Sequence, residues 1–352
     1  MTDLLPFLKN LISASGLSGH ETPVRQLIEA AWRPLVDEVT VSRVGSLHAL
    51  KRGISAEPRP SLLLAAHMDA IGLIVTGING EFLRVTEIGG LDARVLPGQI
   101  VTVHGREDLP GLIVQPSAHL LPPDNRSGPV ALHNLLVDTG LTSRELDPLV
   151  RVGDLASFAQ PPFEMAGDVL VGHSLDNRAS VAAVTHCLDE LQGRKLLWDV
   201  WAVATSQEEK SFAGASTSAY QLRPTLAVAI DVTFASSPGS PGHKTFDMGK
   251  GPTLGYGPNV HPGVYKAVKN LADRLEIPYA VEVMPRHSGT DAYALQVAAE
   301  GIPTMLVSIP LRYMHTAVEM ISMKDITRAG RLLAEFAASL DLEFIDNLTW
   351  ED

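Results

Sequence analysis

Residues 61–69 read Ser-Leu-Leu-Leu-Ala-Ala-His-Met-Asp, and the fold can be predicted from this stretch and its surroundings. Its nearly continuous apolar run is typical of a strand that is buried on both faces of a sheet. After Asp168, further apolar runs alternate with helical patterns. The helices are expected over Arg178–Leu191, Phe212–Gln221, Pro262–Leu275, Thr290–Glu300 and Lys324–Leu340. Alternating strands and helices predict an α/β fold whose sheet is covered on both faces.

The texture of the sequence changes between about Ile71 and Phe163. A hairpin is predicted around Asn79-Gly80, because this dipeptide favours a two-residue turn between strands. Short strands, turns and one modest helix over residues 129–138 are expected next. A chain of 352 residues exceeds the size at which one core stops growing, which favours two domains. We therefore predict a β-rich unit over residues 72–164, inserted between segments 1–71 and 165–352 of the α/β domain.

Composition excludes several classes of function. The 40 acidic residues outnumber the 28 Lys and Arg, giving a formal charge of −12 that argues against nucleic-acid binding. The longest apolar stretch, Leu62–Val75, contains His67 and Asp69 and is too short to span a bilayer. The single cysteine, Cys187, is typical of a reducing compartment and excludes a cysteine-based zinc site. We expect a cytoplasmic protein that binds neither nucleic acid nor membranes.

Residues able to bind metals follow five of the apolar runs. They are His67, Asp176, the pair Glu208 and Glu209, Asp231 and His315. Ligands of open α/β sheets bind outside the carboxyl ends of the strands, so these side chains are expected to converge. A single residue of this kind is usually a cap or a turn former. The prediction therefore rests on their convergence.

Converging carboxylates repel one another unless a proton or a cation neutralises them. Two histidines and three carboxylates suit zinc, cobalt or manganese, and they suffice for two ions if one carboxylate bridges. Asp69 lies two residues after His67 on an extended backbone, where it can hold the imidazole in its ligating tautomer. Glu208 and Glu209 should diverge, so that one binds metal and the other serves as a general base.

The sequence resembles the M42 metallo-aminopeptidases, which include tetrahedral and glutamyl aminopeptidases. The resemblance rests on an ordered set of motifs through most of the chain. They are SGLSGHE from Ser15, AAHMDAIGLIV from Ala65, GGLDARVLPGQIV from Gly89, HSLDNRAS from His173, TSQEE from Thr205, AIDVTFA from Ala229, GKGP from Gly249, SGTDA from Ser288 and RYMHTAVE from Arg312.

This resemblance implies a mixed-sheet, three-layer metallopeptidase domain with an inserted dimerisation domain. It also implies roles for individual residues: His67 and Asp231 for one metal, Glu209 and His315 for the other, and Asp176 bridging. Glu208 would be the general base, with Asp69 supporting His67. The family's activity would be removal of N-terminal residues from short peptides by a metal-activated water. Its members commonly form twelve-subunit homo-oligomers built from dimers.

The chain departs from the family pattern at three places. Ala70 replaces an acid, Phe234 stands where a histidine is common, and residues 210–213 read Lys-Ser-Phe-Ala instead of Val-Gly-Leu-Arg. Every ligand position is kept, so the changes concern substrate preference and efficiency. Two other functions stay open: a glycoside hydrolase, which also uses two carboxylates, and a catalytically weak peptide-binding relative.

Overall fold

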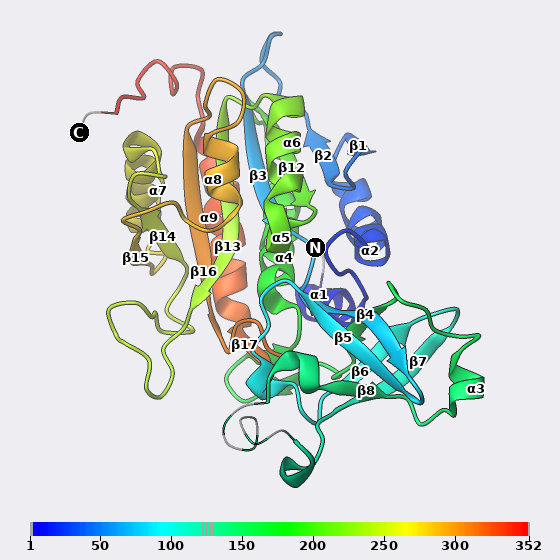
Figure 1. The fold of residues 1–352 in the computed structure, drawn as a ribbon. Coiled ribbons are helices and arrows are strands. Elements are labelled where there is room, and N and C mark those ends of the chain that lie inside the picture. The colour runs from blue at the N-terminus through cyan, green and yellow to red at the C-terminus, as the bar shows by residue number, and fades with distance from the viewer. Residues whose placement is uncertain (1–2, 122, 124–125, 127, 129, 351–352) are drawn as a thin grey trace.

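The computed structural model describes residues 3–121, 123, 126, 128 and 130–350, and Figure 1 shows their arrangement. Two sheets dominate it: a large mixed sheet covered by helices and, beneath it in the view, a closed β-barrel. No helix among these residues is both long and apolar enough to cross a membrane.

The large sheet has the order β1-β2-β12-β3-β13-β16-β17-β11-β10, with β14 beside β16 and β15 beside β14. Its strands are β1 (Glu38–Val41), β2 (Leu47–Lys51), β3 (Ser61–His67), β10 (Phe163–Met165), β11 (Val169–Gly172), β12 (Asp199–Thr205), β13 (Leu226–Phe234), β14 (Thr253–Tyr256), β15 (Ala280–Val283), β16 (Thr304–Arg312) and β17 (Glu319–Ser322). The central strands β12, β3, β13 and β16 are parallel. The predicted strand β3 lies in the middle of the sheet, between β12 and β13, and its side chains are buried on both faces, which explains its apolar sequence.

Helices cover both faces of this sheet, so the predicted α/β architecture is confirmed. They are α1 (Leu4–Ser13), α2 (Thr22–Trp32), α4 (Leu175–Glu190), α5 (Glu208–Ser211), α6 (Ala213–Leu222), α7 (Pro262–Arg274), α8 (Asp291–Gln296) and α9 (Met323–Ser339), with a 3-10 turn over Arg33–Leu35. In Figure 1, α6 and α8 lie in front of the sheet and α9 behind it. The helix α4 packs against α9, β3 and β13. Gly330 permits this close packing, because a Cβ there would lie 2.5 Å from the carbonyl oxygen of Ala183.

The barrel closes in the order β4-β5-β8-β7-β6-β9. Its strands are β4 (Gly72–Asn79), β5 (Phe82–Ile88), β6 (Ile100–His104), β7 (Asp108–Val114), β8 (Leu136–Asp138) and β9 (Leu155–Phe158), with the short helix α3 (Ser143–Leu146) and 3-10 turns over Ala93–Val95, Ala118–Leu120 and Leu132–Asn134. Its interior forms a second apolar core. The hairpin predicted around Asn79-Gly80 is present as β4 and β5. The barrel strands end at Phe158, and β10 already pairs with β11 in the large sheet.

The structure corrects two helices expected from the sequence. The prediction of a helix over residues 129–138 is wrong. Leu132–Asn134 form one 3-10 turn and Leu136–Asp138 form β8. Pro129 lies outside the described residues. These residues form a strand instead of a helix because β8 pairs with both β5 and β7 and so helps to close the barrel. The helix expected over Thr290–Glu300 spans only Asp291–Gln296, since Val297 leaves helical geometry.

Candidate metal centre

The strand ends of the large sheet bring the predicted metal-binding residues together. His67 ends β3, and Asp231 lies on the neighbouring strand β13. Glu208 and Glu209 begin α5, just after β12. Asp176 lies in the first turn of α4, and His315 lies in the turn between β16 and β17. These five segments are spread over residues 67–315, so the centre depends on the complete sheet.

The side chains meet around the two histidines. The Nε2 atom of His67 lies 3.1 Å from Asp176 Oδ1 and 3.7 Å from both Glu208 Oε2 and Asp231 Oδ1. The Nε2 atom of His315 lies 3.3 Å from Asp176 Oδ2 and 3.5 Å from Glu209 Oε1. The two oxygens of Asp176 therefore face two different histidines.

Unusual backbone geometry accompanies these side chains. Gln207, Phe212 and His315 have left-handed φ angles of 58°, 53° and 62°, although none of them is glycine. Asp176 has extended rather than helical angles, so the regular part of α4 starts after it. Backbone strain of this kind concentrates at functional sites, where surrounding contacts hold it in place.

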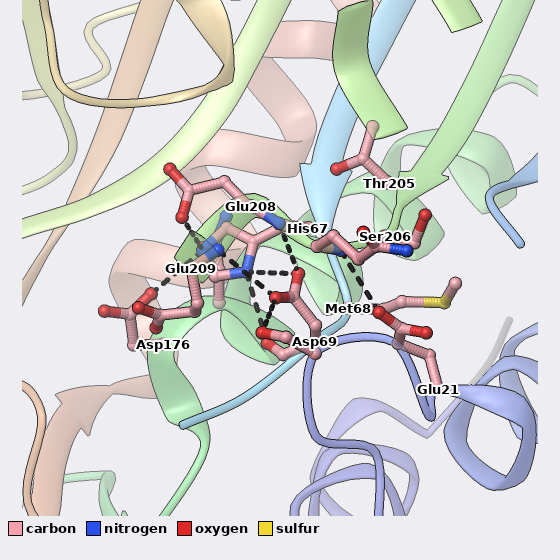
Figure 2. Close-up of polar contacts among 12 residues, drawn as sticks. Glu21, His67, Met68, Asp69, Asp176, Thr205, Ser206, Glu208 and Glu209 are labelled. Atoms are coloured by element: carbon pink, nitrogen blue, oxygen red, sulfur yellow. Dashed lines mark hydrogen bonds and ion pairs between the residues drawn. The ribbon is translucent and has the colours of Figure 1, made fainter. Parts of the chain in front are cut away.

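Asp69 holds several parts of the centre at once, as Figure 2 shows. Its backbone carbonyl lies 3.2 Å from Nδ1 of His67, and its Oδ1 lies 3.5 Å from the same nitrogen. Its carboxylate also accepts hydrogen bonds from the backbone N–H groups of Glu208 at 2.9 Å and Glu209 at 3.2 Å. Asp69 thus contacts Nδ1 of His67 and also holds the backbone of the glutamate pair.

The loop before α2 supports the same region from behind. Ser18 donates its hydroxyl to the Asp69 carboxylate. The buried Glu21 accepts hydrogen bonds from the N–H groups of Gly19 at 2.7 Å and Gln207 at 3.1 Å. These contacts explain why the SGLSGHE motif from Ser15 belongs to the site although it contributes no metal-binding atom.

Two buried carboxylates near the centre were not predicted. Glu319 is 1% exposed and accepts the N–H groups of His315 at 2.9 Å and Asp176 at 3.1 Å. Asp291 is 2% exposed; its Oδ2 accepts the Thr205 hydroxyl, while its buried Oδ1 has no hydrogen-bond partner. Glu319 lies in the motif RYMHTAVE and Asp291 in the motif SGTDA, and this membership is the sequence signal that pointed to them.

The carboxylates of the centre carry strongly perturbed pKa values. Burial raises the pKa of Glu208 to about 11, against the charge of His67 and with added repulsion from Asp231. Burial and the charge of Asp176 raise the pKa of Glu209 to about 7. Burial also raises the pKa of Asp231 well above its ordinary value. Without a cation, these groups cannot all be charged.

The histidines and Asp176 show the complementary pattern. The hydrogen bond with Asp176 raises the pKa of His315 to about 9. Burial would lower the pKa of His67, but Glu208 and Asp176 outweigh it and raise that pKa well above the ordinary value. Burial would raise the pKa of Asp176, but hydrogen bonds from His315 and His67 hold it below its ordinary value. The carboxylates thus favour positive charge at this point of the structure.

The donor set fits divalent metal ions. Two groups of three side chains, His67 with Glu208 and Asp231, and His67 with Asp176 and Glu209, each place ligand atoms within 4.8 Å of one another. Imidazole nitrogens and carboxylate oxygens are ligands for zinc and similar transition metals. The contact of Asp69 with Nδ1 of His67 leaves Nε2 turned toward the carboxylates. A cation there would relieve the carboxylate repulsion.

A pocket of about 380 Å³ opens onto this centre. Phe212 and Phe234, which depart from the family pattern, line the pocket. Lys210 is exposed, and Ala70 is buried and forms a β-bridge with Leu17. Two of the unusual positions therefore lie where a substrate would touch them.

Comparisons with known proteins agree with this geometry. The family model described as M42 glutamyl aminopeptidase matches residues 45–332. The lysyl aminopeptidase of Pyrococcus furiosus is 31% identical over 331 residues, 92% of this chain and 94% of that protein. The TET aminopeptidase of a marine sediment Thaumarchaeota archaeon has a TM-score of 0.93 and 32% identity, covering 98% of this chain and 99% of that one. A TET1 peptidase of Pyrococcus horikoshii can assemble into a tetrahedron or a large octahedral shell. It has a TM-score of 0.84 and 28% identity, covering 96% of this chain and 100% of that one.

Proposed function

This chain belongs to the M42 glutamyl aminopeptidase family, and on that basis we propose that it uses two divalent metal ions to remove N-terminal residues from short peptides. The observation that carries the two-ion proposal is the position of Asp176. Its two carboxylate oxygens face different histidines, and each histidine has a further carboxylate beside it.

The proposed ligands follow from these pairs. His67 and Asp231 would hold one ion, Glu209 and His315 the other, and Asp176 both. Zinc, cobalt and manganese all suit this donor set. When bound, such ions polarise a carbonyl oxygen and lower the pKa of a water molecule.

Glu208 is the proposed general base. Its carboxylate lies beside His67 and lines the pocket, while its backbone is fixed by Asp69. It would accept a proton from the attacking water and deliver that proton to the leaving amine. Asp69 would act as a positioning residue, because its contacts run to His67 and to the N–H groups of both glutamates.

The variant Glu208→Gln tests this assignment. It removes the proton acceptor and keeps the shape of the side chain, so peptide hydrolysis should fall by about 10²-fold or more. Metal content, measured by mass spectrometry of the purified protein, should stay at the wild-type level. The control Glu81→Gln changes an exposed residue in the β4–β5 turn and should leave both readouts unchanged. Wild-type hydrolysis by Glu208→Gln would refute the role of Glu208.

The alternative functions make different predictions. A glycoside hydrolase that used two of these carboxylates would remain active after a chelator removed the metals, whereas the proposed peptidase would not. The converging histidines have no role in that chemistry. A peptide-binding relative would bind metal and peptides tightly without turnover across a broad panel of substrates.

We also propose that residues 72–164 form an inserted domain through which the chain forms a dimer-based oligomer, up to a dodecamer. The barrel exposes apolar side chains, including the paired residues Ile100 and Leu112 at 56% and 43%. The assembly of the related TET1 peptidase supports the proposal. Light scattering after size exclusion tests it, and a monomer at micromolar concentration would contradict it. A cytoplasmic location remains a prediction from the single cysteine.

A further inference from the structure

A carboxylate outside the metal centre lies in the wall of the same pocket. Glu282, on β15, lines the pocket and is partly exposed to it. Its Oε1 accepts the hydroxyl of Thr233 and its Oε2 accepts the hydroxyl of Thr253, each at 2.7 Å. These hydroxyls orient the carboxylate and leave further lone pairs available, because a carboxylate can accept about four hydrogen bonds.

The sheet register places the two hydrogen-bond partners of Glu282 close to the metal centre. Thr233 follows Asp231 by two residues on β13, so both side chains lie on the same face of the sheet. Their Cα atoms are about 7 Å apart along the strand. Thr253 and Asp231 are both register partners of Ser308 on β16. A substrate whose first residue is held at the centre could therefore reach Glu282 with the four-carbon stem of a lysine.

The other pocket walls suit an aliphatic stem that ends in a cation. Phe212, Phe234, Met284 and Met314 provide apolar surface, and aromatic faces attract cations. Among the described residues that line the pocket, none is Lys or Arg. An acidic side chain would therefore meet repulsion from Glu282 and find no Lys or Arg beside that carboxylate in the pocket walls.

The carboxylate has no charged partner of its own among the described residues. Burial raises the pKa of Glu282, and only hydroxyl groups, those of Thr233, Thr253 and Ser308, oppose that rise. A partly buried carboxylate in this state gains from an incoming cation, because an opposite charge favours its ionised form.

From this geometry we propose that Glu282 selects peptides whose first residue is basic. The inference rests on the proposed aminopeptidase function and names its substrate class: a Lys or Arg side chain lies against the aromatic walls and pairs its cation with the Glu282 carboxylate. Glu282 is thus a specificity residue and takes no part in the bond-breaking step. The chain's departures at Phe212 and Phe234 contribute apolar walls to the same pocket.

The test compares three aminoacyl 4-nitroanilides on the metal-loaded, full-length protein. Norleucine has the four-carbon stem of lysine without the ammonium, so the lysyl to norleucyl ratio of kcat/KM isolates the charge. We expect this ratio to be about tenfold or more, and glutamyl anilide to be the poorest substrate. In Glu282→Gln, the lysyl to norleucyl ratio should fall by roughly tenfold. The control Glu107→Gln, an exposed residue between β6 and β7, should keep the wild-type ratio.

The outcomes separate this inference from the proposed function. Hydrolysis of norleucyl anilide at the same efficiency as lysyl anilide would overturn the role of Glu282 and leave the aminopeptidase intact. An unchanged ratio in a folded Glu282→Gln protein would do the same. Absence of hydrolysis of all three substrates would overturn both proposals. The wild-type ratio decides the substrate class even where the variant fails to fold.

Discussion

The buried glutamate Glu319 should control metal affinity although it does not face the metal centre. Its two oxygens accept the N–H groups of His315 and Asp176, which are proposed ligands. In Glu319→Gln only one acceptor oxygen remains, and the new amide group points a donor at the other N–H. Leaving a buried N–H without its acceptor costs about 1–3 kcal/mol, and each 1.4 kcal/mol is about tenfold in binding.

We therefore expect Glu319→Gln to bind divalent metal about ten- to a hundredfold more weakly, in the range that supporting residues of metal sites typically show. Competition against a chelator of known affinity measures this, with zinc, cobalt and manganese tested separately. The exposed Glu343→Gln serves as the matched control. Wild-type metal affinity in folded Glu319→Gln would refute the reasoning, even if the variant lost thermal stability, because the glutamate would then support the fold without organising the ligands.

Three further predictions use other parts of the molecule. Gly90→Ala should weaken metal binding by roughly tenfold in the same competition assay, because the added Cβ would lie 3.1 Å from Nδ1 of His315; unchanged affinity would contradict it. Burial lowers the pKa of His48 to about 4, below the value of about 6.5 in an unfolded chain. The unfolded state therefore takes up the proton first, and the free energy of unfolding should fall by up to about 3 kcal/mol as the pH drops from 6.5 to 4. Urea titrations of His48→Gln over the same pH range should show a smaller loss. A divalent ion at a hundred times its Kd should add about 2.7 kcal/mol and raise Tm by several degrees, whereas an unshifted Tm would count against the metal centre.

The convergence of the metal-binding residues could be predicted because the sequence shows where each buried strand ends. An apolar run followed by a polar residue marks where a buried strand leaves the sheet, and parallel strands leave at one edge. His67, Asp231 and the Glu208-Glu209 pair carry this pattern, and the structure brings them together.

Glu319 and Asp291 carry no such pattern. Glu319 begins a short strand after a turn, and Asp291 lies in the first turn of a helix, where an exposed acid is common. Only the surrounding chain shows that both are buried. The wrong helix over residues 129–138 has a similar cause, because β8 is stabilised by its neighbours β5 and β7, which its own residues do not reveal.

The position of the barrel within the chain has a consequence for synthesis on the ribosome. All barrel strands come from one continuous segment between Gly72 and Phe158, so they can pair as soon as that segment has emerged. The strand β3 is made earlier, but its neighbours β12 and β13 begin only at Asp199 and Leu226. The backbone hydrogen-bonding groups on both edges of this apolar strand therefore stay unpaired while the barrel and α4 are translated. Unpaired strand edges of this kind promote aggregation. Slowing translation after Phe158 should prolong this exposed state. The order of the strands in the sheet therefore determines how soluble the nascent chain is at that stage.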